Sequence, residues 1–233
     1  MNEHPITLHV MDDLRRSRLT VFFRYLLYIP HGIWLEVWGI AVFVVAVLNW
    51  LVALVIGRPA APFQRFNAAY LRYWTTVYAF LMLVANPFPG FTGEPGSYPV
   101  ELSVPTTPEK QSRLKTFFRI FLALPTLVVL YVVLIPAMLI CYPLLSFSWW
   151  AALITGRMPR GFRDLGANAI RYAAQVAGYA LLVTGTYPNS SPYVGMALGE
   201  PVVAAVPVAP AMEAPPAAAE PTAPEAPEAP SEK

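Results

Sequence analysis

Two short segments alternate between apolar and polar residues, the pattern of a strand with one buried face. The first is HPITLHV at residues 4–10, and the second is YPVELSV at residues 98–104. In the first segment Ile6, Leu8 and Val10 fall on one side, and the second segment repeats the pattern. Strands this short are not stable alone. We therefore predict that the two segments pair with each other; two unpaired extended arms are the alternative.

Each alternating segment is followed by an apolar stretch with a narrow polar stripe at helical spacing. Residues 17–31 read SRLTVFFRYLLYIPH and residues 112–126 read SRLKTFFRIFLALPT, with eight of fifteen positions identical. On a helix Ser17, Thr20 and Arg24 share one side. This pattern is typical of a helix at the membrane interface whose arginine extends to the lipid headgroups. A proline closes each stretch, and we expect it to bend or break the helix there.

Long apolar runs come next, and each is long enough to cross a bilayer, which takes about 20 residues. Residues 33–56 contain one carboxylate, Glu36, near their start. In the second half of the chain no charged residue stands within residues 120–156. We expect one span there, at about 128–154, kinked by its two internal prolines.

A turn rich in Gly, Pro and Arg follows each run, GRPAAPFQR at 57–65 and GRMPRGFRD at 156–164. Second apolar helices are predicted at 66–85 and 165–184. These helices either span the bilayer or lie in its interface, so the chain has two or four membrane segments. We expect four, with both arginine-bearing turns in the cytoplasm by the excess of positive charge on that side.

The segments recur in the same order, which indicates an internal duplication. The early parts of the two copies align at an offset of 94–95 residues and the late parts at 99. The copies cover residues 4–90 and 98–190. The predicted fold is an all-α membrane protein of two tandem repeats. Each repeat has an interfacial helix, a proline break, a spanning helix, a turn and a second apolar helix, with one short strand per repeat.

Composition supports the membrane class, because 56% of residues are hydrophobic and 13% are charged, against about 25% charged in soluble domains. The net charge of +2 divides into +7 for residues 1–196 and −5 for residues 197–233. The basic part suits anionic lipid better than nucleic acid, because its arginines interrupt spanning-grade apolar sequence. Residues 197–233 are rich in Pro, Ala and Glu, so we expect a disordered tail. No secretory signal is evident, and the single cysteine allows no internal disulfide.

The motifs SRL-x-x-FFR-x-x-L-x-x-P, TGRMPRGF and RYAAQVAGYALLVTGTYP are similar to a bacterial membrane-domain family. The chain resembles the domain of unknown function 4389 family, in two copies. The second copy is closer, because GRPAAPF in the first lacks the PRG and NPFP replaces the usual Tyr-Pro ending. The resemblance implies a multi-pass or monotopic protein of the bacterial inner membrane, and it brings no established reaction, cofactor or catalytic residue.

Catalytic spacings are absent from the sequence, which has no HExxH, GxSxG, glycine-rich phosphate loop or CxxC motif. His4 and His9 flank one predicted strand and lack a third ligand at metal spacing. His31 follows Pro30 directly and is interpreted as an interfacial polar residue. We therefore expect a protein that is not an enzyme and uses no cofactor and no metal.

The candidate functional residues are arginines at equivalent positions of the two copies, together with one carboxylate. Their plain role is to anchor helices at headgroup depth, and their sharper role is to form a basic site for an anionic lipid between the two halves. Glu36 is a candidate intramembrane carboxylate, which either relays protons or pairs with an arginine such as Arg24. The paired arginines are Arg24 and Arg119, Arg58 and Arg157, and Arg72 and Arg171.

Two functions from different classes are compatible with this pattern. The first is a non-enzymatic scaffold or accessory subunit of an envelope complex, anchored by the repeats and reaching a protein partner with its acidic tail. The second is a small lipid or solute transporter, because duplicated halves with broken helices build many transporters. Either would be a multi-pass inner-membrane protein in contact with lipid, and oligomers are compatible with both.

Overall fold

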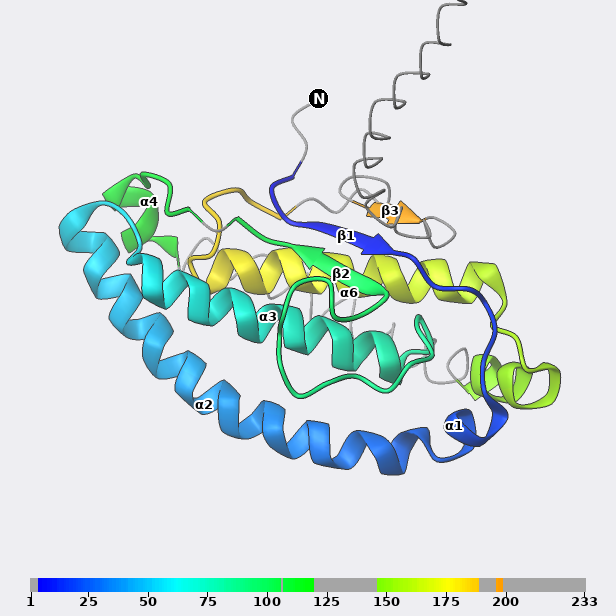
Figure 1. Cartoon of the computed structure of the whole chain (residues 1–233). Coiled ribbons are helices and arrows are strands. Elements are labelled where there is room, and N and C mark those ends of the chain that lie inside the picture. Colours follow the sequence, from blue (N-terminus) through cyan, green and yellow to red (C-terminus); the bar gives the residue numbers. More distant parts are fainter. Residues whose placement is uncertain (1–3, 106, 120–145, 189–195, 199–233) are drawn as a thin grey trace, which may run out of the picture. The chain divides into compact units, whose positions relative to one another are not determined.

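The computed structural model describes residues 4–105, 107–119, 146–188 and 196–198 (Figure 1). Helices dominate, and three short strands form one sheet. Residues 146–155 are also helical. The mostly helical fold with one short strand per repeat agrees with the prediction, and the third strand was not expected. In chain order the elements are β1 (Thr7–Val10), α1 (Arg18–Phe22), α2 (Arg24–Ile56), α3 (Ala61–Leu81), β2 (Val100–Ser103), α4 (Arg113–Phe117), α6 (Arg160–Ala180) and β3 (Met196–Leu198).

The predicted pairing of the two alternating segments is confirmed. β1 and β2 are antiparallel, and Leu8 lies opposite Leu102. These two leucines occupy equivalent positions of the two repeats, at the offset of 94 residues. Equivalent residues face each other across an antiparallel pair only when a two-fold axis passes between them. The strand pair therefore relates the two repeats by an approximate two-fold axis.

The helices α3 and α6 form the layer beneath the strands and run antiparallel. Asn67 near the start of α3 donates a hydrogen bond to the carbonyl oxygen of Leu181, just past the end of α6. At the other end of the pair, a Cβ on Gly166 would stand 3.0 Å from Val84, so the glycine allows close approach. Apolar side chains of both helices pack against the inward faces of β1 and β2 in one core cluster.

Helix α3 lies between the sheet and α2, because its opposite sides contact different elements (Figure 1). Leu71 and Phe80 pack in the cluster with the strands. Tyr73 and Val77 pack instead with Leu35 of α2. Both α3 contact sets are buried, so α3 is a core helix with protein on two sides.

The first helix break lies at Phe23 and not at Pro30, which corrects the sequence prediction. Phe23 ends α1 and precedes α2, with φ −87° and ψ 5°. Pro30 stands inside α2, where its ring lies on the exposed side of the helix. The break repeats at Phe118, after α4. The equivalent proline of the second copy lies outside the described residues.

The second helices of the repeats begin and end about four residues earlier than predicted. α3 starts directly after the turn because Pro62 occupies its first positions, where proline is tolerated. Both helices end before a leucine in the left-handed region, Leu83 with φ 61° and Leu182 with φ 58°. Leucine rarely adopts this conformation, so the surrounding contacts must hold these two turns.

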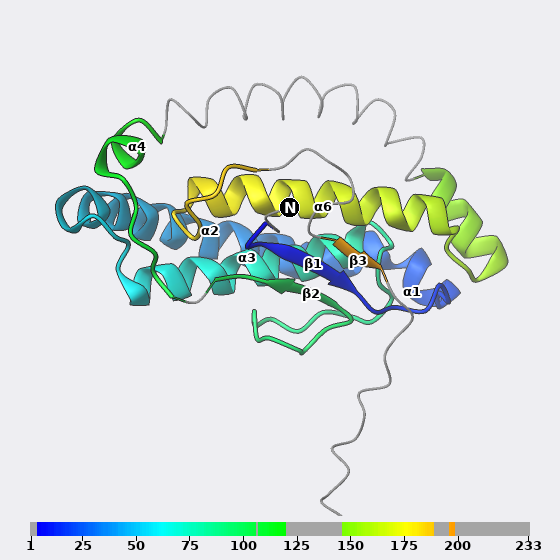
Figure 2. The same ribbon diagram turned by 90° about the horizontal axis from the view of Figure 1, so that it is seen from above.

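Among the described residues α2 is the one helix that is long and apolar enough to cross a membrane, judged by length and composition. The expected second span at 128–154 lies mostly outside the described residues. β3 was not predicted, and it pairs in parallel with the free edge of β1 (Figure 2). It takes in Ala197 and Leu198, so the boundary of the predicted tail moves beyond residue 198. The rest of that tail lies outside the described residues.

Candidate functional site

Arg24 and Arg119 point into the protein, which corrects the expectation that they extend to the lipid headgroups. Arg24 is 1% exposed and donates hydrogen bonds to the carbonyl oxygens of Phe80 and Ala85. Its guanidinium lies 4.4 Å from the centre of the Phe80 ring. Arg119 repeats this arrangement with the carbonyl oxygen of Thr184 and the ring of Tyr179, at 4.2 Å.

These two arginines stabilise the turns that follow α3 and α6, and Arg24 also reaches the last turn of α3. The last carbonyl groups of a helix lack partners within the helix and carry partial negative charge, which a cation satisfies. Here the same turns hold the left-handed Leu83 and Leu182. The phenylalanine break before each arginine directs its side chain to this turn. Arg24 and Arg119 are therefore structural groups of the repeat.

Arg72 and Arg171 have different surroundings although they are equivalent in sequence. Arg72 is half-buried and donates to the carbonyl oxygen of Gly93, 3.0 Å away. Arg171 is fully buried and donates to Asn168 and Gln175, and Gln175 in turn donates to the carbonyl oxygen of Ile6. Burial lowers the pKa of both guanidinium groups from the ordinary value. The Arg171 network ties α6 to the residue before β1.

Arg58 and Arg157 remain exposed, and each follows a glycine that ends a helix in the left-handed region. Gly57 has φ 80° and Gly156 has φ 70°. Their carbonyl oxygens accept hydrogen bonds from the other repeat. The backbone N–H of Gln111 donates to Gly57, and the N–H of Arg16 donates to Gly156, at 2.9 and 2.8 Å.

Each glycine turn gathers cations from both repeats. The Nε of Arg18 lies 3.7 Å from the point where a Cβ on Gly156 would stand, and Arg15 forms an isolated antiparallel bridge with Arg157. At the other turn the Nε of Arg113 lies 3.6 Å from the equivalent point on Gly57. Lys110 precedes Gln111, which bonds to Gly57. We call these groups the first basic triad (Arg58, Lys110 and Arg113) and the second basic triad (Arg15, Arg18 and Arg157).

Two tryptophans add hydrogen bonds between the repeats, from each long or second-copy helix to the short helix of the other repeat. The indole of Trp50 donates to the carbonyl oxygen of Thr116 in α4, at 2.9 Å. The indole of Trp149 donates to the carbonyl oxygen of Val21 in α1, at 2.7 Å. The four residues occupy equivalent positions of the two repeats, so each repeat holds the short helix of the other.

Sequence reasoning found Arg58 and Arg157 and missed four members of the triads. Arg15 and Lys110, like Arg18 and Arg113, are separated by 95 residues, the offset of the early parts of the repeats. That spacing could have been found from the sequence. The contact of these cations with the glycine turns of the other repeat could not, because it depends on how the repeats pack.

Helix α2 has an outer face that is apolar apart from Glu36, and a buried stripe that mixes polar and apolar residues. The stripe contains Arg24, His31 and Asn49 beside Leu35, Val42 and Ala53. His31 Nδ1 lies 2.7 Å from the hydroxyl of Tyr73, and Asn49 accepts a hydrogen bond from the backbone N–H of Ala60 at 2.9 Å. The outer face contains large exposed hydrophobic residues: Leu26, Ile29, Ile33, Trp34, Val37, Ile40, Phe43, Val44, Val47, Leu48, Leu51, Val55 and Ile56.

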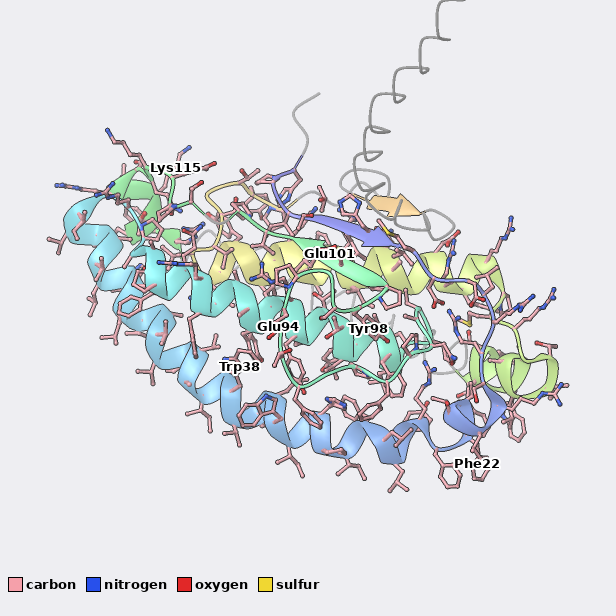
Figure 3. The ribbon with its side chains drawn as sticks, in the orientation of Figure 1. Phe22, Trp38, Glu94, Tyr98, Glu101 and Lys115 are labelled. Carbon is pink, nitrogen blue, oxygen red and sulfur yellow. The ribbon has the colours of Figure 1, made fainter. Side chains whose placement is uncertain are left out.

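The short helices continue this exposed apolar character. Phe22 of α1 points away from the core (Figure 3). Equivalent positions of the second repeat are exposed too, as the pairs show: Leu19 and Leu114, Phe22 and Phe117, Phe23 and Phe118, Leu48 and Phe147, Leu51 and Trp150, Val55 and Ile154. These residues and the outer face of α2 are called the apolar face below.

Glu36 is exposed on α2 and does not pair with Arg24. Twelve residues of helix separate their Cα atoms by about 18 Å, at 1.5 Å per residue. Glu36 instead acts on Tyr70 of α3: burial raises the pKa of that phenol, and the negative charge of Glu36 raises it further.

His4 and His9 lie on different sides of the first strand region. His4 is buried and accepts the backbone N–H of Ile6 at 3.0 Å, whereas His9 is half-buried beside the hydroxyl of Thr7. Within the described ranges no three His, Cys, Asp or Glu residues are grouped so that they could hold a metal ion.

Fold and contacts together define a mostly helical, internally duplicated protein with buried arginines, two exposed basic triads and a large apolar face. The chain belongs to the family described as domain of unknown function DUF4389, which matches residues 18–92 and 113–191 in tandem. This confirms the two-copy resemblance. No curated protein and no solved structure matches the chain.

Proposed function

We propose that the protein is a non-enzymatic scaffold or accessory subunit of a bacterial envelope complex, embedded in the inner membrane by its apolar face. The supporting observation is the exposed apolar outer face of α2. Ile40 and Phe43 are each 70% exposed. In water such side chains would forgo the favourable free energy of removing apolar surface from water. Soluble monomers rarely expose contiguous apolar patches above a few hundred Å². Hydrocarbon is the solvent that suits this face.

In this proposal α2 lies along one leaflet and does not cross the bilayer. Its 33 residues are long enough to cross, at about 50 Å. A crossing α2 would take α3 with it, and the sheet packs on the far side of α3. β2 is an edge strand, and open sheet edges do not occur in hydrocarbon. A flat α2 leaves the sheet in water. This revises the expected four spans.

Transport is the weaker proposal because it requires broken helices near the middle of the membrane. Among the described residues, the one helix long enough to cross, α2, continues through Pro30 without a break. An anchored scaffold needs no such break. The acidic residues 203–233 remain the proposed contact with a protein partner. Deleting them leaves β3 in place, and it should remove a co-purifying protein without releasing the chain from membranes.

The test of membrane embedding uses the full chain expressed in bacteria and membranes washed with sodium carbonate. We expect the protein to stay in the pellet. Ile40→Lys with Phe43→Lys should move it to the wash, because charged side chains at these positions oppose contact with hydrocarbon. Ser103→Lys with Ala180→Lys changes exposed residues outside the apolar face and is the matched control. Equal release of the two double variants would overturn the proposal.

A further inference from the structure

We infer that the two basic triads are binding sites for the phosphate of an anionic phospholipid, each built by both repeats. The inference rests on the proposed membrane function and names the ligand that the protein takes from the membrane. It concerns residues at the two glycine turns and not the buried arginines. Its ligand class is a phosphodiester headgroup carrying a net negative charge, with acyl chains that lie against the apolar face.

Each triad places three cations at one glycine turn, and the ion pairs among the described residues do not include them. The members are exposed, and the ion pairs of the described residues join other groups, Arg16 with Asp12 and Arg163 with Asp164. The carboxylates next to the triads in sequence are Asp13 and Glu109. The carboxylate of Asp13 accepts the backbone N–H of Arg15, at 3.2 Å.

Backbone contacts fix the two glycine turns, so the chain segments that carry the cations are held side by side before a ligand arrives. The second triad has two hydrogen bonds across the repeats, from Arg16 to Gly156 and from Met158 to Leu14, both at 2.8 Å. The first triad has the equivalent of the former bond, through Gln111. It lacks the latter because Pro59, which stands in place of Met158, has no N–H.

Exposed apolar groups follow each set of cations within one helical turn. Leu19 and Phe22 of α1 follow Arg18, and Leu114 and Phe117 of α4 follow Arg113, all more than half exposed. Cationic groups beside bulky apolar side chains match a phospholipid, whose phosphate joins its acyl chains at the interface. A soluble phosphate would use the cations and leave the leucine and phenylalanine side chains in water.

The two-fold relation places an equivalent site at each end of α2. Arg58 follows the last turn of α2 at Gly57, and α1 with Arg18 precedes its first turn. The arrangement predicts two equivalent phospholipid sites per chain. In the flat orientation both sites face the headgroups of one leaflet.

The experiment is native mass spectrometry of the full chain in micelles, titrated with phosphatidylglycerol or with phosphatidylcholine. We expect two phosphatidylglycerol molecules per chain with preference over phosphatidylcholine. Arg18→Gln with Arg157→Gln should leave one site, and adding Arg58→Gln with Arg113→Gln should leave none. Ser103→Glu changes the net charge as much as a single arginine substitution does, on the strand side, and should keep both sites.

A double-variant cycle tests whether each site is shared between repeats. Each single substitution of Arg18 or Arg157 should weaken phosphatidylglycerol binding about fivefold, since a basic residue near an anionic surface contributes about 1 kcal/mol. The two effects should be non-additive, whereas Arg18 with Arg113 should be additive, because those residues belong to different triads.

Three results would overturn the inference. They are unchanged phosphatidylglycerol binding in the four-residue variant, equal losses with Ser103→Glu, and competition by inorganic phosphate as strong as by phosphatidylglycerol. Carbonate-resistant membrane association of the four-residue variant separates the two proposals. The four-residue variant could stay in membranes and still bind phosphatidylglycerol as the unmodified chain does. That result would overturn the lipid-site inference and leave the proposed membrane function standing.

Discussion

The inner stripe of α2 mixes polar and apolar residues, whereas its outer face is almost entirely apolar, so the helix lacks the polar outer side of a water-soluble helix. Arg24, His31 and Asn49 are buried and hydrogen-bonded to α3, to the turns that follow α3 or to the turn that precedes it. Ile40 and Phe43 are 70% exposed. In a soluble protein the polar set would face water and the apolar set would form the core.

The difference shows that the two sets have separate tasks. A buried polar group has a defined partner, and losing that partner leaves an unsatisfied donor or acceptor. An exposed apolar group in lipid has no defined partner, so its size and shape are free within wide limits. Inner substitutions should therefore change stability strongly, and outer ones should change it little as long as they stay apolar.

The largest expected effect is at Arg24. Arg24→Met removes charged hydrogen bonds to two carbonyl oxygens at the end of α3, and it should lower the free energy of unfolding by about 3 kcal/mol. Arg58→Met, an exposed arginine after the other end of α2, should stay within about 0.5 kcal/mol. Thermal unfolding of the full chain in micelles measures both. Similar losses at the two positions would remove the distinction between buried and exposed arginines.

A smaller effect is expected at Asn49, whose side chain accepts the N–H of Ala60 and so fixes the turn after α2. Asn49→Ala should lower the free energy of unfolding by about 1–2 kcal/mol. Leu48→Ala, its neighbour on the outer face, is the matched control and should change it by less than half as much in micelles. A larger loss at Leu48 would indicate that the outer face packs against protein in the micelle.

The sequence predicted features that depend on local pattern. The strand pair followed from alternation at Leu8 and Leu102, and the duplication followed from identical motifs. The direction of the Arg24 side chain could not be predicted in this way. A stripe of Ser17, Thr20 and Arg24 has the same sequence pattern whether it faces lipid headgroups or protein. Its partner, the carbonyl oxygen of Phe80, lies 56 residues away in the chain. Only the packing of α3 settles the direction.

The same limit applies to Pro30 and to β3. Pro30 was expected to break the helix, yet its ring lies on the exposed side of α2 and the helix continues. β3 falls in sequence without strong strand character, and it forms because β1 offers an unpaired edge. Predicting the basic triads would have required two pieces of long-range information, namely the repeat offset and the contacts that the repeats exchange.

The smallest expected effect tests a buried polar group outside α2. Burial lowers the pKa of His4 below its usual value of 6.5, and the positive charge of Arg171 lowers it further, while the hydrogen bonds at Ile6 and Tyr187 oppose the shift. The fold therefore favours neutral His4, and the unfolded chain binds the proton more readily. Stability from this group should be complete above pH 6.5 and decline as the pH falls through 6.5 toward the lower folded-state pKa. The decline should be at most about 1.4 kcal/mol per pH unit, because one proton is taken up.

Unfolding of the full chain in micelles between pH 7.5 and 5 measures this dependence, and His4→Asn should remove it. The same change at His9, which is half-buried on β1, is the control and should leave the decline in place. His4 and His9 stand five residues apart near one sheet, so any general effect of acid on the strands acts on both variants alike. A decline that persists in His4→Asn and disappears in His9→Asn would show that burial at His4 is not what couples protons to folding. It would also weaken the distinction between buried polar and exposed positions.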